Sequence, residues 1–160
     1  MQRATHRLRW ASWLALLWLV ALCYWPGLQG GFVFDDDVNI LGNKHLQIAS
    51  LDLAGLWAPA FSGHAGPLGR PLAMLSFALN YYVDGYDAFQ FKLINLAIHL
   101  CNTLLVGALA YFLFQSVGQT TTSKARPGNV GQWAGWMVAA LWGLHPLDLT
   151  SVLYGVQRLS

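Results

Sequence analysis

The sequence has no glutamate, and only 10% of its 160 residues are charged. An average soluble domain is about 25% charged, so this scarcity argues against a soluble enzyme and against a disordered chain. Nine lysines and arginines and seven aspartates leave a net charge of +2 without a basic stripe, which excludes nucleic acid as an expected partner. The two cysteines, Cys23 and Cys101, lie in apolar runs and indicate neither a disulfide framework nor a metal site.

Apolar residues are what the chain has in excess: they make up 56% of it, and the mean hydropathy is +0.42. Uncharged apolar runs cover residues 10–28, 93–117 and 130–144. A membrane-spanning helix needs about 20 such residues, so the first two runs are long enough. The third has about 15 and spans only if the bilayer thins or the helix continues past Pro146. We therefore predict an all-α, polytopic membrane protein with about three transmembrane helices, at residues 10–28, 91–117 and 130–145.

The first run has a second interpretation, which is a cleaved signal peptide. Its exit reads Cys23-Tyr24-Trp25-Pro26 and lacks the small residues that a cleavage site needs. Trp10 and Trp13 at one end, with the aromatic residues of the exit at the other, are typical of a membrane-interface belt. We therefore favour a membrane helix.

Charge in the connecting segments predicts the orientation. Residues 1–9 form a basic tail with three arginines, and the linker 118–129 carries two cations and no acid. The segment between the first two runs, residues 29–92, instead carries six aspartates and three cations. Because cationic segments stay in the cytoplasm, we expect the tail and the linker there, and the 29–90 loop and residues 146–160 on the outer side. The outer side is then the periplasm or the lumen of the secretory pathway, and of these we favour a multi-pass protein of the bacterial inner membrane with a periplasmic 29–90 loop.

A loop of about 60 residues is too long to be a simple connector. Amphipathic helices are predicted in it at residues 51–61 and 71–83, the second with Pro71 at a suitable first helical position. Both are too short to span a bilayer, so we expect them to lie at the membrane surface or under other protein.

Three consecutive aspartates, Asp35, Asp36 and Asp37, follow the first apolar run. Like charges placed side by side raise one another's pKa. The cluster has three interpretations: a solvated acidic turn, a general base for an acceptor hydroxyl, or a divalent-cation site. The residue chemistry leaves all three open.

Polar residues interrupt the second apolar run. Asn95, His99 and Asn102 share one helical face, and Lys92 begins this stripe one turn earlier. Polar groups at membrane depth either mark a site in the bundle interior or form hydrogen bonds between helices, and both interpretations stay open. We expect Lys92 to extend toward lipid phosphates.

Two arginines and a histidine complete the polar groups expected on the outer side. Arg70 and Arg158 are each able to pair with the aspartates or with a phosphate, because a guanidinium matches phosphate bidentately. His145 precedes a helix-ending proline, where hydrogen bonding at the helix end is its ordinary role. The sequence has no Walker loop, GxSxG, HExxH or zinc-ligand spacing.

Taken in order, these segments resemble one protein family. The chain carries FVFDDDVNILGN at residues 32–43, GRPLAMLSFALNYYVDGYDAFQFKLINLAIHLCN at 69–102 and LHPLDLTSVLYGVQR at 144–158. They resemble the membrane region of the TMTC-type (transmembrane and tetratricopeptide-repeat) protein O-mannosyltransferases and their bacterial relatives, in the GT-C glycosyltransferase superfamily. The matching positions are Asp35-Asp36, Asn43, Arg70-Pro71, Asn80-Tyr81, Asn95, His99, His145-Pro146 and Arg158.

The resemblance implies a partial GT-C bundle and a reaction. A sugar would pass from a polyprenyl-phosphate donor to a protein hydroxyl, or to a glycan, on the outer face of the bilayer. Asp35 or Asp36 would be the catalytic base, and no cofactor or resident metal is assigned, with the divalent-cation interpretation still open. Residues that would bind the lipid phosphate or the acceptor are Arg70, Asn95, His99, His145 and Arg158.

Some features depart from the family pattern. Asp37 is an additional aspartate, Thr150 stands where the family has a glutamate, and Phe91 stands where it usually has a histidine. No 34-residue repeat is visible, and a GT-C enzyme has many more than three membrane helices. We therefore expect an amino-terminal fragment that is inactive by itself. A non-catalytic membrane scaffold and a polysaccharide polymerase or ligase are the alternatives, and silent Asn substitutions at the acidic pair would favour the scaffold.

Overall fold

The computed structural model describes residues 2–33, 36–63, 69–120 and 130–155. These described residues form helices and connecting segments, with no strand among them. The chain divides into two compact units. The first comprises residues 1–25 and 97–148, and the second comprises residues 26–96 and 149–160.

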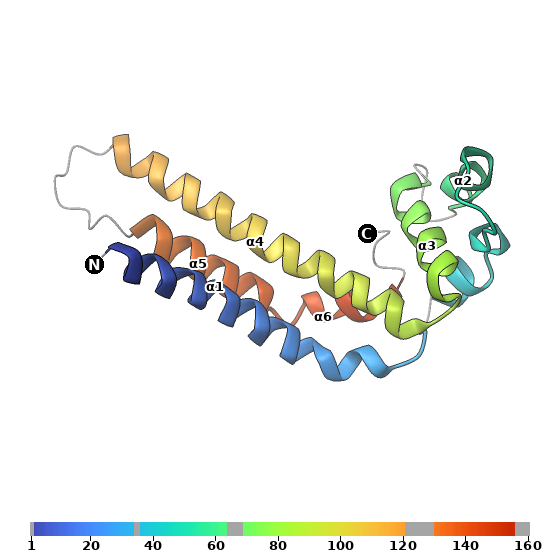
Figure 1. Cartoon of the computed structure of the whole chain (residues 1–160), viewed down its shortest axis with the longest axis horizontal. Helices are drawn as coiled ribbons and strands as arrows, with labels where there is room; N and C mark the ends of the chain where they lie inside the picture. The colour runs from blue at the N-terminus through green and yellow to red at the C-terminus, as the bar shows by residue number, and fades with distance from the viewer. Residues whose placement is uncertain (1, 34–35, 64–68, 121–129, 156–160) are drawn as a thin grey trace. The chain divides into compact units, whose positions relative to one another are not determined.

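The first unit is built from three helices, α1 (Gln2–Tyr24), most of α4 (Ala88–Thr120) and α5 (Val130–Gly143) (Figure 1). Helix α1 starts earlier than the predicted span, so the basic segment 1–9 is largely helical and continuous with the apolar run. Helix α5 packs beside α1. The helix ends at Gly143, before the proline that was expected to stop it.

Small residues face inward on α5, and large apolar residues face outward. Its buried residues are Gly131, Gly135, Ala139 and Gly143, at a spacing of four. Its exposed large side chains are Trp133, Met137 and Leu141. This distribution is the reverse of a helix that lies on a soluble core, and it lets helix backbones approach closely.

Two helical segments are long and apolar enough to cross a membrane. Arg9–Gln29 has a mean hydropathy of 1.6, and Ala88–Ser116 has a mean hydropathy of 1.8. Only 22% and 28% of their most apolar windows are buried, whereas the core helix of a soluble protein is mostly buried. Helix α5 has 14 residues and rises about 21 Å, less than the roughly 30 Å of a bilayer core, so the third predicted span is not confirmed.

The second unit holds the helices of the predicted outer loop. Helix α2 (Leu53–Ala60) lies within the predicted 51–61 segment, and α3 (Pro71–Asp84) covers the predicted 71–83 segment. The Asp52 side chain caps α2 by accepting the Gly55 N–H at 3.0 Å, and Pro71 occupies the first turn of α3. The remaining elements are η1 (Trp25–Gln29), η2 (Asp37–Leu41), η3 (Lys44–Leu46), the first turns of α4, and α6 (Asp148–Leu153).

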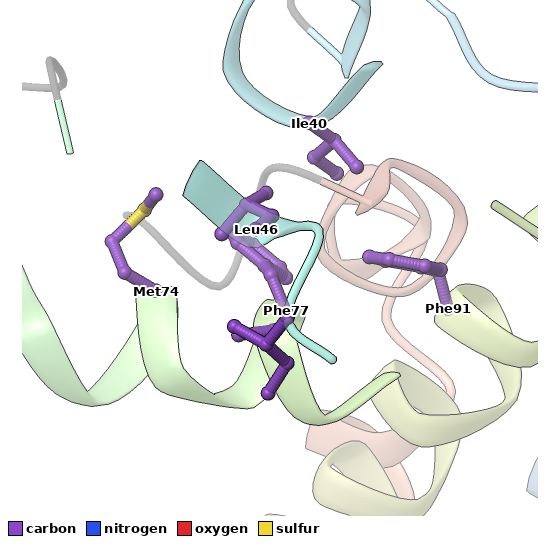
Figure 2. Close-up of a cluster of buried hydrophobic side chains, with 7 residues drawn as sticks. Ile40, Leu46, Met74, Phe77 and Phe91 are labelled. Atoms are coloured by element: carbon purple, nitrogen blue, oxygen red, sulfur yellow. The ribbon is translucent and has the colours of Figure 1, made fainter. Parts of the chain in front are cut away.

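One apolar cluster forms the core of the second unit, and Figure 2 shows its side chains. Its buried members are Ile40, Leu46, Ile48, Met74, Phe77, Ala78 and Phe91. The Phe91 ring, at the start of α4, lies 6.0 Å from the Phe77 ring of α3 and 5.5 Å from the Phe32 ring. Burying each such ring contributes about 1.5–3 kcal/mol. The cluster therefore fixes the chain on both sides of the aspartates to α3 and α4.

Candidate functional site

The aspartates of the acidic motif lie in different environments. Asp36 is fully buried, at 0% exposure, whereas Asp37 is exposed and begins η2. The Asp36 Oδ2 atom accepts the backbone N–H of Val33 at 3.1 Å and that of Gly155 at 3.2 Å. Asp35 lies outside the described residues. Asp36 is the predicted catalytic residue that the structure describes, and backbone N–H groups hold its carboxylate.

Lys92 of α4 lies beside the segment that leads into the acidic motif. Its side chain is 2% exposed, and its Nζ atom donates to the Gly30 carbonyl oxygen at 2.7 Å. Lys92 is therefore buried against protein and does not extend to lipid phosphates as expected.

Asn95 holds the segment that follows α6. Its buried side-chain amide donates to the carbonyl oxygen of Val152 at 3.3 Å and to that of Tyr154 at 2.9 Å. Lys92 and Asn95 are three residues apart and lie on one face of α4. Asn102, which was expected to extend this stripe, is exposed.

Arg70 is exposed immediately before α3, in an unusual backbone conformation. Its φ of 44° is the only positive value for a non-glycine residue among the described residues. A side chain in the left-handed region costs roughly 1–2 kcal/mol, and such strain recurs at functional sites. The exposed guanidinium is able to meet an anionic group from outside the unit.

Asn43 organises the turn after η2. Its buried Nδ2 donates to the Ser62 Oγ at 3.0 Å and to the Ser62 carbonyl at 3.3 Å, and its Oδ1 accepts the His45 N–H at 3.2 Å. The partners of the Asn43 side chain are residues of the protein, so these hydrogen bonds stabilise the loop between η2 and α2.

His99 lies in the interior of the first unit, where it is 4% exposed. Its Nε2 atom is 3.0 Å from the Gly143 carbonyl oxygen, an acceptor, so Nε2 carries the proton. The imidazole lies between the Trp142 ring, stacked at 4.8 Å, and the Tyr24 ring, edge-on at 5.1 Å. These contacts join α1, α4 and the end of α5, as the interhelical interpretation of this residue requires.

The exposed His145 makes two hydrogen bonds just beyond the end of α5. Its Nδ1 accepts the Leu147 N–H at 3.3 Å, and its carbonyl accepts the Tyr24 hydroxyl at 3.4 Å. This is the helix-end hydrogen bonding that the sequence favoured for it. Arg158 lies outside the described residues.

Curated proteins similar to this chain are named protein O-mannosyl-transferases. Human "Protein O-mannosyl-transferase TMTC4" is 32% identical over 144 residues, covering 86% of this chain and 19% of that protein. The mouse protein of that name is 30% identical over 156 residues, covering 93% and 20%. "Protein O-mannosyl-transferase Tmtc3" of Drosophila melanogaster is 28% identical over 147 residues, covering 86% and 16%. The chain belongs to the TMTC family.

This TMTC-family chain spans about a fifth of the length of the TMTC4 proteins. No family model matches it, and no solved structure matches it. Among the residues that the structure describes, no group of three or more His, Cys, Asp or Glu side chains is placed to hold a metal ion.

The predicted site residues of the TMTC-family chain fall into both units. Asp36, Arg70 and Asn95 belong to the second unit, and His99 and His145 belong to the first. The structure brings Asp36 to Gly155, which sequence reasoning did not single out because it follows Asp36 by 119 positions. The signal that was present is the segment 144–158 that resembles the family, because Gly155 lies in it, three residues before Arg158.

Proposed function

We propose that this chain forms part of a membrane-embedded glycosyltransferase of the GT-C type. The proposed reaction moves mannose from a polyprenyl-phosphate donor to a hydroxyl group of a protein. The observation that carries the proposal is the likeness over 86% of the chain to a protein named O-mannosyl-transferase. The exposed Arg70 and the carboxylates of the acidic motif are the groups that this chemistry uses.

The proposed chemistry is an inverting displacement. A carboxylate of the Asp35-Asp36 pair takes the proton of the acceptor hydroxyl, and the oxygen attacks the anomeric carbon of the sugar. The bond from that carbon to the phosphate oxygen breaks, and polyprenyl phosphate leaves with the electron pair. The guanidinium groups of Arg70 and Arg158 stabilise the charge that develops on the departing phosphate.

The proposed topology places the amino terminus and residues 118–129 in the cytoplasm and the 29–90 loop on the outer face of a bacterial inner membrane. Helices α1 and α4 cross the bilayer, and α5 crosses a locally thinned region with Trp133, Met137 and Leu141 toward lipid. The charge difference between the connecting segments supports this orientation.

We place α2 on the outer surface of the bilayer. Leu53 is 82% exposed, Trp57 is 66% exposed and Phe61 is 62% exposed, at a spacing of four residues that puts them on one face. The Trp57 and Phe61 rings are 4.7 Å apart. Aromatic rings with apolar neighbours favour the headgroup region of a membrane.

The orientation is tested with single cysteines in a background that carries Cys23→Ser and Cys101→Ser. A membrane-impermeant maleimide is expected to label Ala49→Cys in intact cells, and to label Ser123→Cys only after the cells are permeabilised. Labelling of Ser123→Cys in intact cells would contradict the orientation.

The reaction is tested in membranes that contain the full protein that the gene encodes, because the 160-residue chain alone is expected to be inactive. Labelled mannose is supplied on polyprenyl phosphate or, as the matched control donor, on GDP. Transfer to protein from the lipid donor alone is expected. Transfer to glycan instead would favour the polymerase or ligase alternative, and no transfer from any lipid-linked sugar would favour the scaffold.

A further inference from the structure

The environment of Asp36 is that of a structural carboxylate. The side chain has no exposed surface, and its Oδ2 atom already accepts two backbone N–H groups, from Val33 and Gly155. A general base must come within about 2.6–3.2 Å of the proton that it removes. An acceptor hydroxyl has no route to a side chain that is covered in this way.

Gly155 fits against this carboxylate because it has no side chain. A Cβ atom on Gly155 would lie 3.3 Å from the Asp36 Oδ1 and 3.0 Å from the Ile40 Cδ1. Both carboxylate oxygens of Asp36 therefore lie against the backbone at Gly155, one through a hydrogen bond and the other through packing.

Helix α4 also contacts these two segments. Lys92 donates to the Gly30 carbonyl, just ahead of the acidic motif. Asn95 donates to the Val152 and Tyr154 carbonyls, just ahead of Gly155. One face of α4 thus joins residues 30–36 to residues 152–155.

We propose that Asp36 is a positioning residue, one part of a buried latch formed by Asp36, Lys92, Asn95 and Gly155. The latch fixes the segment 152–155, which leads into the motif that contains Arg158, against the acidic motif. The reacting carboxylate is then the neighbouring Asp35. The assignment of reacting and positioning roles rests on the proposed function, whereas the latch itself rests on the contacts above.

Two substitutions at Asp36 test whether it acts by accepting backbone N–H groups or as a base. Asp36→Ala removes the acceptor for the Val33 and Gly155 N–H groups, whereas Asp36→Asn keeps an oxygen acceptor and cannot take up a proton. We expect Asp36→Ala to lower sugar transfer, and Asp36→Asn to recover at least about tenfold of that loss. A folded Asp36→Asn variant as inactive as Asp36→Ala would assign Asp36 to the chemistry and overturn the proposal.

Hydrogen exchange at the Gly155 amide gives a readout that needs no activity. Asp36→Ala removes the acceptor, and exchange at Gly155 is expected to become about tenfold faster or more. Asp37→Ala is the matched control, because Asp37 is exposed, and it is expected to leave that exchange unchanged. Unchanged exchange in Asp36→Ala would overturn the latch. Faster exchange in Asp36→Ala, together with no sugar transfer by the wild type, would support the latch and refute the proposed function.

Discussion

Gly107 of α4 and Gly135 of α5 face each other with no side chain between them. A Cβ atom on Gly135 would lie 2.7 Å from the Gly107 carbonyl oxygen, and one on Gly107 would lie 3.1 Å from the Gly135 carbonyl oxygen. A Cβ atom on Gly107 would also lie 2.5 Å from the Trp13 ring. Small residues at this crossing therefore set the distance between the two helices in the first unit.

Replacing the glycine at this crossing is expected to separate the helices. In Gly135→Ala the new methyl group would meet backbone, which cannot rotate away, so we expect a loss of about 1–3 kcal/mol of stability. Thermal unfolding in detergent micelles measures it. Gly31→Ala is the matched control, since a Cβ there meets nothing within 4 Å. Equal unfolding temperatures for the two variants would refute the close approach.

Asn95 is expected to matter far more than Asn102, although both are asparagines of α4. Asn95→Ala leaves the Val152 and Tyr154 carbonyls without their donor, at a cost of about 1–3 kcal/mol. Asn102→Ala removes an exposed amide and is expected to cost under about 0.5 kcal/mol. Chemical unfolding of both variants in the same detergent checks the difference, and similar costs would show that Asn95 does not hold this segment.

Two substitutions at His99 separate its ring packing from its hydrogen bond. His99→Phe keeps a ring between Tyr24 and Trp142 but loses the donor to Gly143, at about 1–3 kcal/mol. His99→Ala loses both and is expected to cost about 3–5 kcal/mol. Unfolding measurements rank the variants. If alanine were tolerated as well as phenylalanine, the ring contacts would carry no stability.

Asp52 is expected to make α2 sensitive to acid. The Ser50 hydroxyl and the Gly55 N–H donate to its carboxylate and hold the pKa of that carboxyl below its ordinary value of 3.8. Because the folded pKa is depressed, the cap stabilises α2 fully above the unfolded pKa, and this stability is lost as the pH falls through the folded pKa. The Gly55 amide chemical shift should titrate with a midpoint below 3.8, and Asp52→Asn should abolish this titration. A midpoint at or above 3.8 would contradict the cap.

Features set by local rules were predictable from the sequence. An uncharged, largely apolar run predicted a helix where α4 lies, and Pro71 predicted the start of α3. The early start of α1 was missed because the charge boundary at Arg9 is no boundary for helix geometry. Charged residues indicate where a membrane-spanning segment ends, but they do not end the helix, so α1 extends through them.

Contacts between distant segments were not predictable in the same way. The acidic motif left three interpretations open, because a partner of Asp36 is the backbone amide of Gly155, which is distant in the sequence. Lys92 was expected at the lipid surface, since nothing near it in the sequence shows that Gly30 supplies an acceptor. The positive φ of Arg70 precedes a proline, where local sterics favour an extended backbone, so only the folded chain reveals it.

The central claim is that the acidic motif supplies the base for mannose transfer from a polyprenyl-phosphate donor. The most direct measurement is the rate of that transfer to protein in membranes that carry the wild type, Asp35→Asn or Asp37→Asn. General-base catalysis contributes about 10²–10⁴-fold, so Asp35→Asn is expected to lower the rate at least about 100-fold, with Asp37→Asn close to wild type. Transfer by Asp35→Asn at the wild-type rate would contradict the claim.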